Sequence, residues 1–268
     1  GISNIGKSTF SLYMIVSTAV NHNWRWVIYS AENRTAAVKM KLIQFAANMQ
    51  IKEMNRHDLK RSYQWVNDHF TIISNKSIYS YSDLLVFGEK LIRQGDYDGY
   101  FIDPYNSLKI QMSSGSSLTT HDYHYEAASE FLTFTQSHNM SLWLSTHAIT
   151  EAQRRKGEDG MPRAPFAEDT EGGGKFVNKS DNFLTFHRKI QHPEYDMRRT
   201  VEVHVRKVRE VESGGEPTSL DYPVLFEMNR LSTGFVNKFT GKPLFKSILA
   251  DVPPPKINFE GVVYEDAF

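Results

Sequence analysis

The chain has 268 residues, which is enough for one large α/β domain with its own hydrophobic core or for two small domains. Its hydrophobic and charged fractions, 40% and 23%, are those of an ordinary globular protein, and no apolar run approaches the roughly 18 residues that a membrane span needs. The formal net charge of zero argues against non-specific coating of duplex DNA. There is no cysteine, so disulfides and thiolate metal sites are excluded.

Helices and strands are expected to alternate through the first half of the chain. Residues 9–22 carry an apolar stripe at Phe10, Met14 and Ile15, which is the spacing of a helix with one buried face. The run from Trp26 to Tyr29 is short and apolar, so it predicts a buried strand. On the same criteria, further helices are predicted at 35–49, 58–69, 82–94 and 121–138, and further strands at 71–74, 100–103 and 141–146.

The second half has a different pattern. Residues 148–175 are polar and contain several glycines and prolines, which predicts a mobile loop. Three successive strands, joined by turns, are then expected at 182–187, 200–208 and 223–228. This order predicts an α/β fold with a mostly parallel sheet, flanked by helices and extended by antiparallel strands at its C-terminal edge. We expect one domain over residues 1–236 and a C-terminal extension over 237–268.

The most specific motif lies at the N-terminus. Gly1, Gly6, Lys7 and Ser8 match the pattern G-x4-G-K-[ST], and a predicted helix begins directly afterwards. In such a loop the glycines let backbone N–H groups surround phosphates, the lysine supplies a cation, and the serine hydroxyl can ligate Mg²⁺. A chance turn with an unrelated lysine would not explain the helix. We therefore predict ATP and Mg²⁺ as ligands, bound by Gly1, Ser3, Asn4, Gly6, Lys7, Ser8 and Thr9.

A phosphate loop of this kind follows a strand that aims it at the ligand. No such strand stands before Gly1, and the sequence has neither an initiator methionine nor a signal peptide. We therefore expect the sequence to be a fragment of a longer protein, cut on its N-terminal side.

Two carboxylates close neighbouring predicted strands. Asp103 ends the run 100–103, and Glu32 follows the run 26–29. The carboxyl ends of parallel strands face the ligand crevice, so Asp103 can hold Mg²⁺ and Glu32 can orient or deprotonate an attacking water. Two simpler roles stay open. Asp103 would cap the turn at Pro104, and Glu32 would be favoured by the dipole of the next helix.

Together these motifs resemble those of the RecA-like hexameric replicative helicases, which include the bacterial DnaB family, the helicase–primase of phage T7 and its mitochondrial relative. The resemblance covers residues 1–236 and depends on the order of the motifs, because no motif after the phosphate loop is specific alone. In chain order they are the Walker A loop Gly1 to Thr9, the S-x-E element Ser30 to Glu32, the Walker B region Phe101 to Leu108, the strand end Leu144 to His147, the late motif Gly174 to Arg188, Lys207 with Arg209, and the hairpin Asn229 to Phe235.

The resemblance implies a role for each residue of the site. It makes Glu32 the catalytic glutamate and makes Asp103, with Ser8, the metal-binding group. It also makes Lys7 a catalytic cation and His147 a sensor of the γ-phosphate. The alternative for His147 is a hydrogen-bonded histidine that only supports the end of its strand.

Later cations are implied to act outside their own subunit. The resemblance places Lys207 and Arg209 at the ATP of a neighbouring subunit, and on a strand these two residues share one face. The alternative is a solvated edge strand whose cations prevent aggregation. In the family, the segment that corresponds to residues 148–175 contacts DNA in a channel, although acidic residues balance its charge here. The DNA contacts expected from it are Arg154, Arg155, Lys156 and Lys175.

The implied function is that of a replicative DNA helicase. ATP hydrolysis would drive a homo-oligomeric ring, a hexamer in the family, in the 5′–3′ direction along single-stranded DNA. We expect a cytoplasmic location, in the bacterial host if the protein comes from a phage. Two alternatives remain: a RecA-like DNA-dependent ATPase that forms filaments or is regulatory, and a nucleotide-binding loader module that does not hydrolyse ATP.

Residues 251–268 are the most distinctive part of the predicted extension. Three consecutive prolines precede an acidic end, Glu265 and Asp266, and a terminal Phe268. Prolines cannot continue a helix or a central strand, so this segment is expected to extend from the core. It resembles the acidic tail with which the T7 helicase–primase engages its polymerase, and this implies a replicative polymerase as a partner. The alternative is a solvated terminus without a partner.

Overall fold

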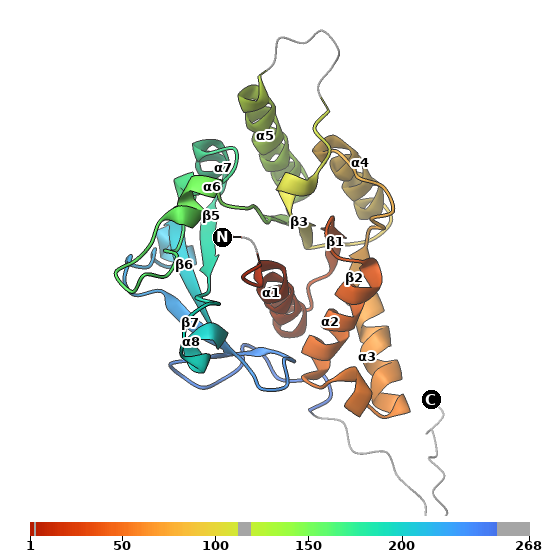
Figure 1. Cartoon of the computed structure of the whole chain (residues 1–268). Helices are drawn as coiled ribbons and strands as arrows, with labels where there is room; N and C mark the ends of the chain where they lie inside the picture. The colour runs from red at the N-terminus through yellow and green to blue at the C-terminus, as the bar shows by residue number, and fades with distance from the viewer. Residues whose placement is uncertain (3, 112–118, 251–268) are drawn as a thin grey trace, which may run out of the picture.

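The computed structural model describes residues 1–2, 4–111 and 119–250. Its first sheet is parallel and has four strands in the order β2-β1-β3-β4 (Figure 1). The strands are β1 Trp26–Ser30, β2 Phe70–Ile72, β3 Gly99–Asp103 and β4 Ser141–Leu144. Each strand predicted in this half is confirmed, with small shifts at its ends. Within this described part, no helix combines the length and the apolar character that crossing a membrane requires.

Helices cover both faces of the parallel sheet, because its central strands are apolar on both sides. Trp26 and Ile28 of β1 pack with one group of helices, whereas Val27 and Tyr29 pack with the other. The first group is α1 Lys7–His22, α2 Thr35–Ala47 and α3 Arg56–His69, and the second is α4 Tyr81–Ile92 and α5 Thr120–His138.

An antiparallel sheet with the order β5-β6-β7-β8 forms the other side of the molecule. Its strands are β5 Asn182–His187, β6 Thr200–Val208, β7 Val224–Met228 and β8 Phe235–Asn237. Its apolar face, with Val201, Val203 and Phe226, belongs to the same core cluster as α1. Figure 1 shows α1 between this sheet and α2. The helix that follows the phosphate loop is therefore held from two sides.

The predicted fold class is confirmed, but the antiparallel strands form a sheet of their own instead of extending the parallel one. A cavity of about 830 Å³ separates the two sheets and is lined by residues of β4, of β5 and by Gly1. The β4 residues are only half-buried, whereas those of β1 and β3 are buried throughout.

The segment 148–175 has more structure than the mobile loop that the sequence predicts. It contains helix α6 Thr150–Arg154 and the short turn Ala167–Asp169, and it leads into α7 Gly174–Lys179. Contacts with β6 and with the loop after β5 hold it: Arg206 Nη2 donates to the Pro165 carbonyl at 3.1 Å, and Lys189 Nζ lies 2.5 Å from Asp159 Oδ2. The polar composition of this segment therefore did not prevent it from making contacts with the rest of the domain.

The remaining short helices are η1 Ile51–Glu53, η2 Tyr105–Ser107, α8 Tyr195–Arg199 and α9 Val211–Gly214.

The first part of the predicted C-terminal extension packs on the domain. Phe245 is buried, and its ring centroid lies 5.0 Å from that of Tyr13 in α1. The Ile248 N–H donates to the Ala46 carbonyl of α2 at 3.0 Å. The hydrophobic core thus continues beyond residue 236. The proline-rich, acidic segment 251–268 lies outside the described residues.

Candidate nucleotide-binding site

The phosphate loop ends in a helix N-terminus that has no competing side chain among the described residues. Gly6 is the residue before the first turn of α1 and has φ 89°, in the left-handed region that favours glycine. No described side chain caps this end, and the first turn of α1 contains no acidic residue. Its backbone N–H groups therefore remain available for an anion, which the helix dipole also favours.

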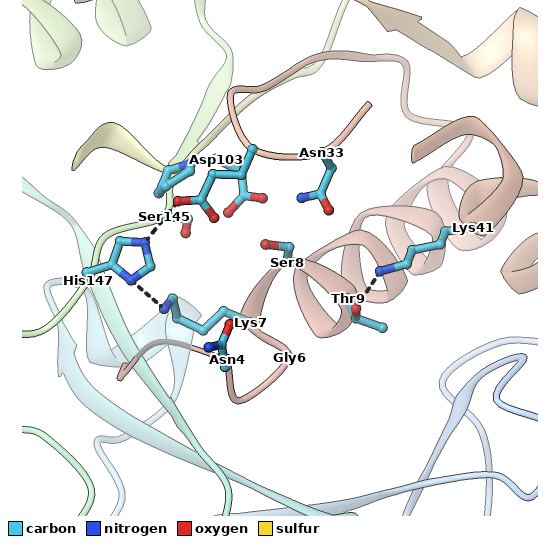
Figure 2. Close-up of a pocket in the computed structure, with 12 residues that line it drawn as sticks. Asn4, Gly6, Lys7, Ser8, Thr9, Asn33, Lys41, Asp103, Ser145 and His147 are labelled. Carbon is cyan, nitrogen blue, oxygen red and sulfur yellow. Dashed lines mark hydrogen bonds and ion pairs between the residues drawn. The ribbon is translucent and has the colours of Figure 1, made fainter. Parts of the chain in front are cut away.

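A cavity of about 400 Å³ opens in front of this helix end (Figure 2). Parallel pairing aligns the carboxyl ends of β1 and β3, with Ser30 opposite Asp103, so the residues that end these strands converge there. All of the predicted loop residues that the structure describes contribute to it, except Gly1; Ser3 lies outside the described residues. The lining residues are Asn4, Gly6, Lys7, Ser8, Thr9, Glu32, Asn33, Lys41, Asp103, Pro104, Ser145 and His147.

Asp103 provides a buried carboxylate with unused bonding capacity. The residue is only 2% exposed, and its Oδ1 has no hydrogen-bond partner among the described residues. Burial raises the pKa of this carboxyl group, while the hydroxyl groups of Ser8 and Ser145 and the Lys7 ammonium lower it. A carboxylate oxygen without a partner, close to a serine hydroxyl, suits a hard cation such as Mg²⁺. Asp103 and Ser8 thus fit the predicted metal role.

Lys7 reaches back over its own loop. Its Nζ donates to the carbonyls of Ile2 at 2.9 Å and Gly1 at 3.2 Å, and it lies 3.1 Å from His147 Nδ1. Burial lowers the pKa of Lys7, whereas Asp103 and Glu32 raise it. The ammonium is therefore a partly desolvated cation beside the N-terminus of α1, which is the position expected of a group that binds phosphate.

His147 and Glu32 form a polar chain that starts at Lys7. An ammonium has only donors, so Nδ1 of His147 accepts the contact from Lys7 and Nε2 carries the proton. Nε2 lies 3.5 Å from Glu32 Oε1, and the same oxygen accepts a 3.0 Å hydrogen bond from Ser107 Oγ. Burial, and then Lys7, lower the pKa of His147, which favours this neutral ring.

Sequence patterns missed several residues of the site. Asn33 directly follows the element Ser30 to Glu32, and Ser145 lies inside the strand end Leu144 to His147, but no role was assigned to either residue. Asn106 fixes His147, because its Oδ1 accepts the His147 N–H at 2.7 Å. Asn106 lies inside the Walker B region Phe101 to Leu108, but no sequence pattern indicated this contact. Lys41 carried no signal, because it lies one helix away and only tertiary packing brings it to the cavity.

Lys207 and Arg209 do not line the cavity of their own chain. The Lys207 ammonium donates to three carbonyls at the end of α7, at 2.7 Å to Val177, 2.8 Å to Ser180 and 3.4 Å to Asn178. Arg209 Nη1 lies 2.6 Å from Asp181 Oδ1. Lys207 lies in β6, whereas Arg209 directly follows the end of that strand, so the shared strand face that the sequence predicts is not formed. Arg209 Nη2 also reaches the Asn178 carbonyl, at 3.5 Å, so the two side chains have this one acceptor in common.

The cations predicted to contact DNA are not equivalent. Arg154 and Lys156 are exposed. Arg155 Nη1 contacts both carboxylate oxygens of Asp169, at 2.9 and 3.1 Å, and Lys175 Nζ donates to the His121 carbonyl at 3.2 Å. Arg155 is therefore engaged within its own segment, whereas Arg154 and Lys156 are accessible to a ligand from solvent.

No family model matches the chain. In sequence it is similar to the Twinkle homolog protein, chloroplastic/mitochondrial, of Arabidopsis thaliana, with 26% identity over 225 residues. The alignment covers 80% of this chain and 30% of that protein. The chain thus spans about 30% of the length of this curated relative.

Solved structures share the fold. A DnaB-like replicative helicase, described with its interactions with primase, has a TM-score of 0.69 at 16% identity, over 88% of this chain and 55% of that one. A structure of a separate ATPase domain has a TM-score of 0.68 at 14% identity, over 88% and 82%. A KaiC-like protein from Pyrococcus horikoshii reaches 0.56 at 15% identity, over 88% and 85%. The fold is therefore that of a RecA-like ATPase domain, and the resemblance to replicative helicases is confirmed at this level.

Proposed function

We propose that this chain is the ATP-hydrolysing motor domain of a replicative DNA helicase, which works as a homo-oligomeric ring on single-stranded DNA. One observation carries the proposal. A single cavity at the strand ends brings together a phosphate loop, a buried carboxylate and a polar chain that ends in a second carboxylate. The sequence similarity to a Twinkle homolog favours a helicase among the many enzymes with phosphate loops.

Binding of the nucleotide is proposed to use the start of α1 and Lys7. The backbone N–H groups would donate to the phosphates, and Lys7 would exchange its contacts with the Gly1 and Ile2 carbonyls for charged phosphate oxygens, which are stronger acceptors. Ser8 and Asp103 would hold Mg²⁺, which supplies charge neutralisation for the phosphates when it is bound.

Glu32 is proposed to orient or deprotonate the attacking water. Ser107 and His147 hold its carboxylate from two sides, and 49% of its side-chain surface is exposed, so water can reach it. His147 connects Glu32 to Lys7. A change in the contacts of Lys7 at the γ-phosphate would thereby alter the position of the water-activating carboxylate.

Residues that lie outside this cavity are proposed to contact the neighbouring subunit and the DNA. Arg209, with Lys207 beside it, would complete the site of the neighbouring subunit in a hexameric ring. Arg154 and Lys156 would contact the DNA strand, along which the ring would move in the 5′–3′ direction. We also propose that the protein comes from a phage and works in the cytoplasm of a bacterial host. Residues 251–268 would contact a replicative polymerase.

The direct test is ATP turnover by a Lys7→Ala variant, measured as phosphate release with and without single-stranded DNA. We expect a loss of at least about 100-fold, because the variant lacks the cation that stabilises developing phosphate charge. The control is Lys52→Ala, which removes an exposed lysine of η1 and should hydrolyse ATP normally. Circular dichroism must show an intact fold. Normal ATP turnover by Lys7→Ala would refute the assignment of this cavity as the site of ATP hydrolysis.

Assembly is tested by electron microscopy with an ATP analogue and a DNA fork. Closed rings on one strand support the helicase. A helical filament would favour the RecA-like alternative, and tight ATP binding without turnover in any assembly would favour the loader module.

A further inference from the structure

A second lysine enters the cavity from outside the phosphate loop. Lys41 lies on α2, next to the buried Leu42, at the border between the core-facing and solvent-facing sides of the helix. Its Nζ donates to Thr9 Oγ1 in the first turns of α1 at 2.8 Å. Figure 2 shows Lys41 and Lys7 on opposite sides of Ser8.

The charge of Lys41 lacks a carboxylate partner in the described part of the chain. Within residues 1–2, 4–111 and 119–250, no acidic side chain comes within ion-pair distance of its ammonium, and its hydrogen bond goes to a neutral hydroxyl. Burial lowers the pKa of Lys41, and Asp103 raises it. A half-buried ammonium in a polar cavity is costly unless an anion compensates its charge.

Lys39, two residues earlier on α2, behaves differently. It does not line the cavity. Its Nζ donates to Asn67 Oδ1 at 2.7 Å and lies over the Tyr63 ring, 4.9 Å from the centroid. These contacts are those of a lysine on a helix surface. Lys41 is therefore not placed in the cavity merely because α2 is rich in lysine.

We propose that Lys41 is a second phosphate-binding cation, which contacts the nucleotide at the end of the cavity near Thr9. The inference rests on the proposed nucleotide binding and adds a specific ligand to it. Lys7, on the other side of Ser8, is directed toward His147 and Glu32, where hydrolysis is proposed. The two ammonium groups would then reach different phosphates.

The positions of Lys41 and Lys7 predict different effects on the kinetics of ATP hydrolysis. Lys41 would bind a phosphate that keeps its charge throughout the reaction, so its contribution is equal in the ground state and the transition state. Loss of such an interaction raises KM and leaves kcat nearly unchanged. Lys7, beside the reacting phosphate, should affect kcat.

The test compares Lys41→Met with Lys39→Met in the whole chain. Both variants remove one positive charge from α2 and keep a similar side-chain length. Binding of ADP, and of a non-hydrolysable ATP analogue with Mg²⁺, is measured by calorimetry at several salt concentrations. We expect Lys41→Met to weaken both affinities by about 10- to 100-fold and to flatten their salt dependence, since one charge-assisted bond is lost. Lys39→Met should match the wild type, and Lys41→Arg should recover part of the affinity.

The outcomes separate this inference from the proposed function. If the wild type binds no nucleotide, both are wrong. If the wild type binds and Lys7→Ala does not, but Lys41→Met binds as tightly as Lys39→Met, only the role of Lys41 is overturned. A purely structural role is indicated if Lys41→Met lowers the melting temperature without nucleotide and weakens adenosine binding as much as ADP binding, and this result also overturns the inference.

Discussion

The two sheets hold their charged side chains in different ways. In the cavity at the carboxyl ends of the parallel strands, Asp103 at the end of β3 is buried and Lys7 at the start of α1 is half-buried. Lys207 in β6 of the antiparallel sheet, and Arg209 directly after β6, lie outside that cavity and contact the end of α7 and Asp181. Parallel strands bring their ends together at one edge, whereas a meander distributes its residues over a surface.

Arg209 and Lys207 also differ from each other in how firmly they are held. Arg209 and Asp181 form an exposed ion pair, with 42% and 62% of their side-chain surfaces accessible. Such pairs contribute about 0–1 kcal/mol, and the other Arg209 hydrogen bond, from Nη2 to the Asn178 carbonyl, is long at 3.5 Å, so Arg209 can leave these partners at little cost. Lys207 donates to three backbone carbonyls, and removal of this cap would leave them with fewer donors. Of the two cations, Arg209 is thus the better suited to act on another subunit.

The largest effect that we predict tests this difference. Arg209→Ala should bind ATP normally and hydrolyse it about 1000-fold more slowly, which is the typical contribution of an arginine finger. Mixing Arg209→Ala subunits with Glu32→Gln subunits should restore some phosphate release, because one type of interface then has both residues intact. If mixed rings form and regain no activity at any ratio, Arg209 does not act across the interface.

A smaller effect is expected when the buried carboxylate is changed. Asp103→Asn keeps the size of the side chain and removes its charge, so the Mg²⁺ concentration for half-maximal ATP turnover should rise by about 10- to 100-fold. The matched control is Asp98→Asn, at the opposite end of β3, where the Asp98 carboxylate accepts the Arg25 N–H at 2.8 Å. An unchanged Mg²⁺ requirement in Asp103→Asn would remove Asp103 from the metal site.

Lys207 should matter more for stability than for chemistry within one subunit. Lys207→Met removes the cation at the C-terminal end of α7 and should lower the free energy of unfolding by about 1–2 kcal/mol. Urea denaturation measures this change, with Lys52→Met as the control for loss of an exposed charge. Full stability, combined with hydrolysis as slow as in Arg209→Ala, would instead assign Lys207 to the neighbouring site.

The smallest effect concerns acid stability of the antiparallel sheet. His187 is buried opposite Glu202, and burial lowers its pKa from 6.5, with His204 and Lys189 adding to this and Glu202 opposing it. The folded chain therefore binds fewer protons than the unfolded chain, and stability falls as the pH drops through about 6.5.

Thermal unfolding at pH 7.5 and 5.5 tests this contribution. His187→Gln should reduce the acid-induced drop in melting temperature by at most a few degrees, and His22→Gln, an exposed control on α1, should leave it unchanged. An identical drop in His187→Gln and wild type would show that other groups control acid stability.

Local sequence predicted the elements of the fold well where apolar periodicity was strong, as in residues 9–22 and at β1 and β3. It failed for residues 148–175, because polar composition indicates exposure but not the contacts of Asp159 with Lys189 and of Pro165 with Arg206. It also placed the antiparallel strands on the edge of the parallel sheet. Pairing depends on which edges meet in space, and no pattern within either strand specifies this.

The sequence alone determined the phosphate loop, the strand-end carboxylates and the helicase resemblance, because each is encoded by neighbouring residues with fixed spacing. Tertiary structure alone decided which distant groups join them. It brought Lys41 from α2 to Thr9 and Asn106 to the backbone of His147, and it placed Lys207 at the end of α7 and Arg209 beside Asp181. These contacts depend on how helices and strands pack against each other, so residues far apart in the chain become neighbours only once the core has formed.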